Sequence, residues 1–258
     1  MGYYHITERT NKLNDDYRKF IVLHKSNRSY AQNNKIISLF NSNSWKGSRC
    51  FIIGGGESLK GFDFSLLKDE VTMGINKAFT VYSNFTINYS MDSTLYDLMK
   101  SGTYDKPNEP RLWDKWVSFT RVRVFLTPME IKQFGPEVHL VRKVISPSFN
   151  RQDLDNGIWG GKNSGMGAIS LAIALGSTEI YLLGYDCKAK STTHWHSGYE
   201  PNRDVAIFDK KLHEYKAELE GVAHQIAALG VKIYNCSPDS DLKCFPSVNI
   251  KEVLNVQP

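Results

Sequence analysis

The chain has 258 residues, of which 41% are hydrophobic and 23% are charged, and its formal net charge is +5. These values are typical of a soluble globular protein with one large core, and they exclude a disordered or low-complexity chain. No apolar run approaches the roughly 20 residues that a membrane-spanning helix needs. Residues 1–9 lack the apolar centre of a signal peptide. We therefore expect a cytoplasmic protein, whose modest positive charge suits anionic ligands without selecting one.

The first 47 residues are polar and basic, with apolar residues in broken helical spacing. This pattern predicts one or two helices that pack on the main domain. The basic side chains form either a solvated face or an arm that contacts DNA. We expect residues 1–47 to be a helical basic extension and residues 48–258 to be the main domain.

Strand and helix patterns alternate from residue 48 onward. The predicted strands are residues 50–53, 71–75, 85–90, 116–119, 123–126, 180–183 and 231–235. An apolar helix is predicted over residues 165–175, before Gly176, and a long amphipathic helix over 204–229, before Gly230. Strands that are separated by helices predict an α/β fold with a doubly wound, mainly parallel sheet. The less regular stretch 99–161 contains five prolines and is interpreted as insertions or a lid.

The four cysteines, Cys50, Cys187, Cys236 and Cys244, are scattered along the chain. Their spacing indicates neither a zinc knuckle nor a disulfide framework. A reducing compartment fits this pattern best.

A glycine-rich loop, Gly54-Gly55-Gly56-Glu57-Ser58, follows the first predicted strand. Glycines let the backbone approach a ligand, and amides at the start of a following helix can hold phosphate oxygens. The loop lacks the third small residue of the dinucleotide fingerprint, and Asn76 stands where that fingerprint has an acidic residue. NAD is therefore disfavoured, and the loop either binds a nucleotide or phosphate or is a plain strand-to-helix turn.

Ligands of an open parallel sheet bind outside the carboxyl ends of its strands, so the loops there should converge. Asn76 is predicted either to contact a ribose or base or to cap residues 77–79. Asp92 either contacts Mg²⁺ or a sugar or caps the helix predicted from Ser93. The pair Asn163-Ser164 supplies a cap and free amides to the apolar helix, and Gly184-Tyr185-Asp186 ends another strand at the same edge.

The loop after Asp186 contains His194, Trp195, His196 and Tyr199. Two histidines two residues apart could hold a metal, but a third ligand is not evident in the sequence, so we predict no metal site. A histidine could instead take the proton of an acceptor hydroxyl, while the aromatic rings stack on a sugar or base. The remaining alternative is a surface loop with incidental histidines.

These motifs together resemble the Campylobacter-type bacterial sialyltransferases and the related DUF115 family, which includes 6-hydroxymethylpterin diphosphokinases. The resemblance covers about residues 48–250. The blocks that carry it are the glycine loop with Ser58-Leu59-Lys60-Gly61-Phe62-Asp63, Gly74-Ile75-Asn76, Asn163-Ser164-Gly165, residues 172–186 and residues 231–238. The third and fourth blocks are the most specific.

The resemblance implies a Rossmann-like, metal-independent glycosyltransferase that uses a CMP- or UDP-linked sugar as substrate and has no prosthetic group. Carried over by position, the nucleotide is held by Gly54, Gly55, Gly56, Ser58, Asn76, Asn163, Ser164 and Gly184. His196 becomes the general base, Tyr185 or Tyr199 faces the leaving phosphate, and Asp92, Asp186 and His194 face the sugar or acceptor. The acceptor is a glycan or a modified nucleobase in DNA, and a homo-oligomer remains open.

Two departures from the family pattern put sialic acid itself in question. Gly161 stands near a position where those enzymes carry arginine, and the loop between Asp186 and His194 is much shorter. The main alternative is a Mg²⁺-dependent ATP diphosphokinase of the hydroxymethylpterin type, with Asp92 and Asp186 as metal ligands. A third possibility is a nucleotide-binding protein without catalytic activity.

Overall fold

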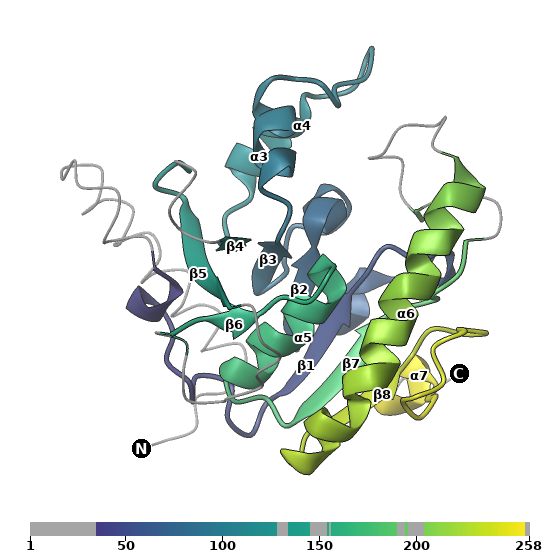
Figure 1. The fold of residues 1–258 in the computed structure, drawn as a ribbon. Coiled ribbons are helices and arrows are strands. Elements are labelled where there is room, and N and C mark those ends of the chain that lie inside the picture. The colour runs from purple at the N-terminus through teal and green to yellow at the C-terminus, as the bar shows by residue number, and fades with distance from the viewer. Residues whose placement is uncertain are drawn as a thin grey trace.

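The protein was analysed as a computed structural model, which describes residues 35–127, 134–144, 154, 156–189, 194, 195 and 204–255. Its centre is a sheet of eight strands in the order β6-β5-β4-β3-β2-β1-β7-β8, and each pairing between neighbours is parallel (Figure 1). The strands are β1 (Arg49–Ile53), β2 (Val71–Ile75), β3 (Ile87–Ser90), β4 (Val122–Thr127), β5 (Val138–Val144), β6 (Ile158–Trp159), β7 (Glu179–Leu183) and β8 (Lys232–Asn235). The expected α/β, Rossmann-like class is confirmed.

The direction in which strands are added to the sheet reverses at β1. Strands β2 to β6 lie on one side of it, and β7 and β8 lie on the other. β1 pairs with β7 in a register that places Ile53 opposite Leu183. The two strands therefore end together, and the loops that follow them flank the topological switch point where ligands of such sheets bind.

The strands are connected by helices of unequal length. The α-helices of the described residues are α3 (Ser93–Lys100), α4 (Leu112–Ser118), α5 (Ser164–Ala174), α6 (Val205–Ala228) and α7 (Ile250–Val253). Shorter 3₁₀ turns are η1 (Ile36–Ser38), η2 (Glu57–Leu59), η3 (Phe64–Leu67) and η4 (Asn76–Thr80). The connections from β1 to β2 and from β2 to β3 contain only these 3₁₀ turns, so no full helix follows the glycine loop.

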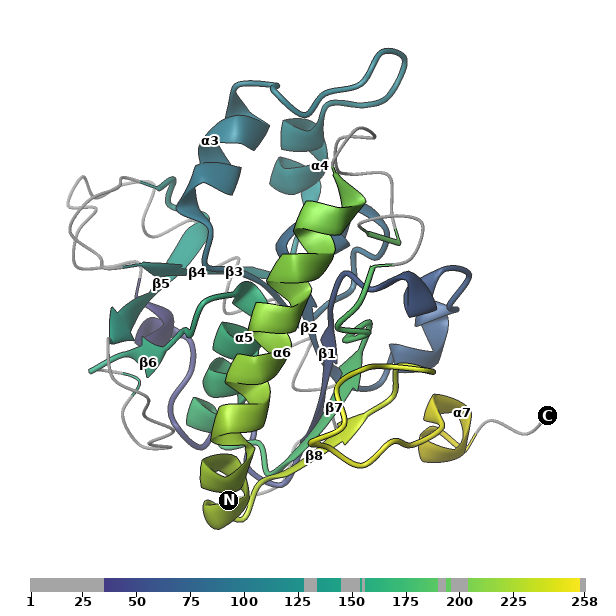
Figure 2. The ribbon, with the colours of Figure 1, turned by 45° about the vertical axis from the view of Figure 1, so that its right-hand side comes forward.

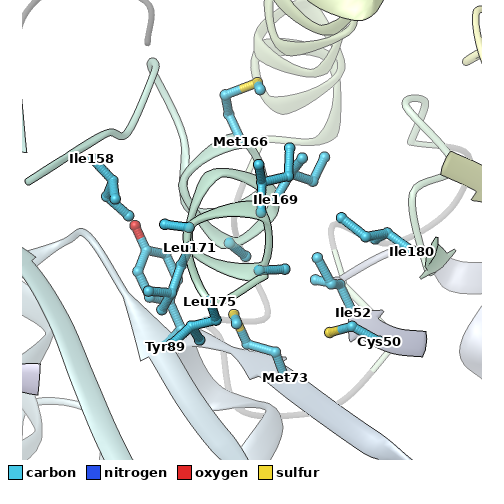
Figure 3. Packing of buried hydrophobic residues seen from close by; sticks show 14 of the residues in the cluster. Cys50, Ile52, Met73, Tyr89, Ile158, Met166, Ile169, Leu171, Leu175 and Ile180 are labelled. Carbon is cyan, nitrogen blue, oxygen red and sulfur yellow. The ribbon is translucent and has the colours of Figure 1, made fainter. Parts of the chain in front are cut away.

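Alternating residues of β1 serve two separate apolar cores. Cys50 and Ile52 pack with α5 and α6 on one face, whereas Phe51 and Ile53 pack with the residues of η3 and α4 on the other. Figure 3 shows α5 lying against the first face, where Ile169 and its neighbours meet residues from the central strands. Such burial on both faces explains the continuous apolar runs of the central strands.

Helix α6 crosses the same face as α5 in Figure 2. Its fully buried residues, Leu219, Val222 and Ile226, all belong to its second half. The first half contains no fully buried residue and contributes side chains to the site described below.

Most of the predicted elements agree with the structure within two residues, but the stretch 99–161 was misread. Residues 116–119 were predicted as a strand, whereas Leu112–Ser118 form α4 because Leu112 and Trp116 bury one helical face. β5 and β6 were not predicted, and they extend the sheet where insertions or a lid were expected. This part of the chain is therefore integral to the sheet.

Residues 35–47 pack within the main core. Ile36, Phe40 and Trp45 are buried, and the Trp45 amide donates to the carbonyl of Leu175 at 2.8 Å. The predicted helices within residues 1–34 lie outside the described part of the chain. The boundary at residue 47 therefore remains a prediction.

Candidate ligand-binding site

A cavity of about 430 Å³ lies at the carboxyl ends of β1, β2, β3 and β7. Its lining comes from the glycine loop, the loops after β2, β3 and β7, the start of α5, His194 and one side of α6. Of the described residues that were predicted as site residues, all except Ser58 line this cavity. The sequence argument that the strand ends converge is therefore confirmed in space.

The glycine loop is bonded directly to the loop after β7. The Gly54 amide donates to Leu183 O at 2.7 Å, and the Gly56 amide donates to Gly184 O at 2.9 Å. A Cβ at residue 54 would lie 2.7 Å from Gly184 O, which is too close for any side chain. The glycines thus allow two backbones to meet at the switch point.

Asp186 anchors the same loop through its carboxylate. One oxygen accepts the Ser58 amide at 2.8 Å, and the other accepts the Ser58 hydroxyl. A Cβ at residue 56 would lie 2.5 Å from the carboxyl carbon of Asp186. Because the amides of Gly54, Gly56 and Ser58 all donate within the protein, they are not available to a phosphate. These bonds do not test the prediction that the loop binds a nucleotide or phosphate.

Asn76 joins three elements at the end of β2. Its Oδ1 accepts hydrogen bonds from the hydroxyls of Ser90 at 2.8 Å and Ser164 at 3.1 Å. Each hydroxyl oxygen also accepts a hydrogen bond from the backbone. The Asp92 amide donates to Ser90, and the Met91 amide donates to Ser164. The hydroxyl protons are therefore directed at Oδ1, which fixes the side-chain orientation and leaves Nδ2 as a donor at the cavity.

The alternative role of Asn76 as a helix cap is wrong. Residue 76 is the first residue of η4, and no side chain caps that turn. Its φ of 53° lies in the left-handed region, which asparagine tolerates better than most residues. The backbone turn is held by Asn88, whose Nδ2 donates to Asn76 O at 2.9 Å.

The N-terminus of α5 also opens on the cavity. Asn163 caps this helix as predicted, because its Oδ1 accepts the Met166 amide at 3.0 Å. Glu218 of α6 fixes the approach to the cap by accepting Lys162 N at 2.9 Å and Asn163 Nδ2 at 3.4 Å. The helix has 11 residues, so its aligned dipoles favour an anion at this end.

Tyr185 and Asp92 have structural partners as well as places in the cavity lining. The Tyr185 hydroxyl donates to Gly165 O at 3.1 Å, and burial raises the pKa of that hydroxyl well above its usual range. Oδ1 of Asp92 accepts the Thr94 amide at 3.0 Å and the Thr94 hydroxyl at 2.6 Å. The N-cap interpretation of Asp92 is therefore confirmed, while its second oxygen, Oδ2, makes neither of these two bonds.

The segment His194-Trp195 lies on the glycine loop. Trp195 donates from its backbone amide to Gly55 O at 3.2 Å and from Nε1 to Gly54 O at 3.1 Å. These bonds bring His194 over Gly55, where a Cβ would lie 2.8 Å from the imidazole Cδ2. The predicted catalytic residues His196 and Tyr199 lie outside the described residues, so the structure does not test them.

Sequence reasoning missed one wall of the cavity. Phe208, Leu212, Tyr215 and Leu219 line it from α6. Their spacing of four, three and four residues places them on one helical face, and this amphipathic spacing could have indicated the wall. Tyr104 lines another part of the cavity, and no sequence signal singled it out.

The acidic residues of the cavity do not form a recognisable metal centre. Within the described ranges, no three His, Cys, Asp or Glu side chains are grouped as metal ligands. Lys188 also lines the cavity, and its Nζ is paired with Asp241 at 3.0 Å.

No helix among the described residues is both long enough and apolar enough to cross a membrane.

Comparison with known proteins gives a likeness in fold. No protein-family model matches the chain, and no curated protein matches it. A solved structure of the sialyltransferase CstII from Campylobacter jejuni, in complex with the substrate analogue CMP-3FNeuAc, is similar over 78% of this chain and 86% of that chain. The two are 16% identical, with a TM-score of 0.41. No match supports the resemblance to DUF115 or to the diphosphokinases.

Proposed function

We propose that the protein is a glycosyltransferase that moves a sugar from a nucleotide-activated donor, linked to CMP or UDP, to an acceptor hydroxyl. The observation that carries this proposal is the meeting of Asn76 and Ser164 with the N-terminus of α5. They meet in a cavity at the switch point of a parallel sheet, where nucleotides bind in such folds. The sequence blocks that resemble bacterial sialyltransferases favour sugar transfer over nucleotide binding without catalysis.

The donor's phosphate is assigned to the start of α5 rather than to the glycine loop. Amides at the start of a helix have no acceptor within it, and Asn163 satisfies the one belonging to Met166. Asn76 Nδ2 and the α5 amides are then donors to the nucleotide. The glycine loop acts as a wall without side chains, which lets the ligand approach the backbone closely.

The reaction requires a base for the acceptor hydroxyl. The hydroxyl oxygen forms a bond to the anomeric carbon as the bond from that carbon to the phosphate oxygen breaks. The nucleotide leaves with the electron pair. A histidine takes the hydroxyl proton, and we retain His196 for this role, as the family resemblance implies. His194 lines the cavity and is the second candidate.

Tyr185 and Asp186 have positioning roles in this proposal. The Tyr185 hydroxyl proton is already donated to Gly165, so we do not assign it to the leaving phosphate. Both oxygens of Asp186 accept hydrogen bonds from Ser58 and hold the glycine loop. Asp92 keeps Oδ2 for a sugar or acceptor hydroxyl.

Diphosphate transfer with Mg²⁺ is the less favoured alternative. It would use Asp92 and Asp186 as ligands, but each oxygen of Asp186 already accepts a hydrogen bond from Ser58, which leaves fewer lone pairs for a metal. Activity in excess EDTA distinguishes the two reactions, because phosphoryl transfer depends on the metal. Full donor turnover in EDTA would support sugar transfer.

The first experiment is a thermal-shift panel of CMP, UDP, GDP, ADP and ATP, each with and without Mg²⁺. A ligand that binds only the native state raises the melting temperature. We expect a metal-independent shift with CMP or UDP. A shift with ATP alone, and only with Mg²⁺, would overturn the proposal in favour of the diphosphokinase.

A second experiment assigns the base. His196→Ala should keep nucleotide affinity and lose about 10² to 10⁴ of turnover. His194→Ala is the matched variant, two residues away in the same segment. If His196→Ala leaves turnover unchanged and His194→Ala abolishes it, His194 is the base.

The remaining expectations belong to the same proposal. The proposed acceptor is a glycan or a modified nucleobase in DNA, and the basic residues 1–47 would contact DNA if it is the latter. DNA binding would weaken steeply with salt, and no binding at low salt would exclude that acceptor. We also propose a cytoplasmic location and leave the oligomeric state open.

A further inference from the structure

Tyr104 is a lining residue of the cavity whose position is held by its neighbours. It lies in the connection between α3 and α4, is half-buried and lines the cavity. The connection is tied at its far end, because Asp105 accepts the Leu112 amide at 2.9 Å and Arg111 Nε at 3.0 Å. The tyrosine is thus held on an anchored segment rather than on a free loop.

A fully buried lysine supports the ring. Lys77 has 0% exposure, and its Nζ lies 3.1 Å from the centroid of the Tyr104 ring. An ammonium against an aromatic face is attracted by the ring quadrupole, more strongly when both are shielded from water. Lys77 thus lies against the ring of a tyrosine that also lines the cavity.

Several apolar and aromatic side chains line the cavity together with Tyr104. Leu95 of α3 lines the same cavity, and Phe208, Leu212 and Tyr215 line it from α6. Asp92, the N-cap of the helix that carries Leu95, also lines the cavity. A ligand that fills this region must present an apolar surface to the aromatic residues and hydroxyls to a carboxylate.

A pyranose ring has this combination of surfaces. Its C–H bonds form an apolar face, and its hydroxyls lie around the edge, where a carboxylate oxygen can accept them. We propose that Tyr104, supported from behind by Lys77, is the platform on which a sugar ring stacks in this cavity. This inference rests on the proposed function and names the sugar subsite within it. The ring belongs either to the donor or to the acceptor.

The test compares wild type with Tyr104→Leu and Tyr104→Phe by calorimetric titration. The probes are CMP and UDP, CMP-sialic acid and UDP-glucose, and methyl β-galactoside added to protein saturated with the nucleotide that binds. Tyr104→Leu keeps apolar bulk but removes the ring, and we expect it to weaken a sugar-bearing probe about tenfold while the free nucleotide changes less than about twofold. Tyr104→Phe should remain within about threefold of wild type.

The two sources of the ring give different patterns. A loss of affinity for the nucleotide sugar alone assigns the platform to the donor. A loss of affinity for the methyl glycoside alone assigns it to the acceptor. Equal affinity of Tyr104→Leu and wild type for every sugar-bearing probe would overturn the inference. It would also be overturned if wild type neither bound the methyl glycoside nor bound a nucleotide sugar more tightly than the corresponding free nucleotide.

Two further variants separate stacking from general destabilisation. Lys77→Met removes the supporting charge but keeps a similar length, and it should weaken the same sugar probe by about threefold. Tyr234→Leu is the matched control, because Tyr234 is also half-buried and stacks on Tyr181 at 5.2 Å without lining the cavity. It should leave sugar affinity unchanged. Failure of wild type to bind any nucleotide would refute the proposed function itself, before the platform is tested.

Discussion

Asp186 and Ser58, which are 128 residues apart, are joined by two hydrogen bonds, from the amide and from the hydroxyl of the serine. The pair holds the loop after β1 against the loop after β7. Because the Asp186 carboxylate is the acceptor in both hydrogen bonds, the effect of a substitution at residue 186 depends on whether the new side chain can also accept them.

Asp186→Asn should preserve most of the function. An asparagine can accept the Ser58 amide with its oxygen and donate its NH₂ to the Ser58 hydroxyl, which then acts as acceptor. We expect nucleotide affinity within about threefold of wild type, whereas Asp186→Ala leaves both serine donors without partners and costs about 1–3 kcal/mol. Calorimetry and urea unfolding measure the two effects. A loss of activity of about a hundredfold in Asp186→Asn would instead point to a metal ligand.

Gly56→Ala should destabilise the protein by about 1–3 kcal/mol, because the new methyl group would overlap the Asp186 carboxylate. Gly221→Ala is the matched control. Nothing lies within 4 Å of a Cβ built at residue 221, which is inside α6, so that change should stabilise by about 0.5–1 kcal/mol. Urea unfolding of both variants tests the difference, and an equal loss in both would contradict the close contact.

Asn76→Asp should separate folding from binding. The aspartate keeps the oxygen that accepts from Ser90 and Ser164 and tolerates the left-handed backbone, but it replaces the Nδ2 donor by a negatively charged oxygen. We expect an unchanged melting temperature and at least about tenfold weaker nucleotide binding. Asn76→Ala should lower both the melting temperature and the affinity for the nucleotide. Unchanged affinity in Asn76→Asp would place the phosphate elsewhere.

The buried cysteines predict a loss of stability at alkaline pH. Burial raises the pKa of Cys187 and of Cys236 to about 12, above the usual value of 9.0 for the thiol. The folded state therefore retains protons that the unfolded state loses, so this contribution is complete below pH 9 and disappears as pH rises from 9 towards 12. Urea unfolding at pH 8, 9 and 10 should show falling stability, and Cys236→Ser should flatten the slope.

The same cysteines should be slow to react in the native protein. At pH 8 the thiolate fraction of a thiol with a pKa of about 12 is on the order of 10³-fold lower than that of an unperturbed cysteine. Iodoacetamide should therefore label Cys187 only after unfolding in urea. Rapid labelling of native protein at pH 8 would show that the cavity exposes this thiol.

The alternation of apolar strands and capped helices was enough to predict the sheet and the long helices. β1, β2 and α5 are nearly continuous apolar runs, and such runs indicate elements buried on both sides. α4 was misread because Trp116 to Phe119 looks like a short strand of large residues. In the structure, Trp116 packs against Phe79 at 5.1 Å, a tertiary contact that local propensity does not contain.

β5 and β6 escaped prediction for different reasons. β5 includes His139, Arg142 and Lys143, whose polarity obscures the strand pattern, and β6 has only two residues. At the site, the strand ends could be predicted because parallel topology brings them together. Asn76 is hydrogen-bonded to Ser164, which is 88 positions away, and Asp186 to Ser58, which is 128 positions away. No local sequence pattern contains such pairs.

Asn76 and Lys77 are consecutive, yet the first accepts hydrogen bonds from Ser90 and Ser164 and the second lies against the Tyr104 ring. Any shift of this one turn would move both contacts at once. Laboratory evolution towards a new sugar would therefore gain little from changes in the turn, since they would also alter recognition of the nucleotide. The side chains of α6 that line the cavity offer independent positions at which the protein could acquire a different substrate.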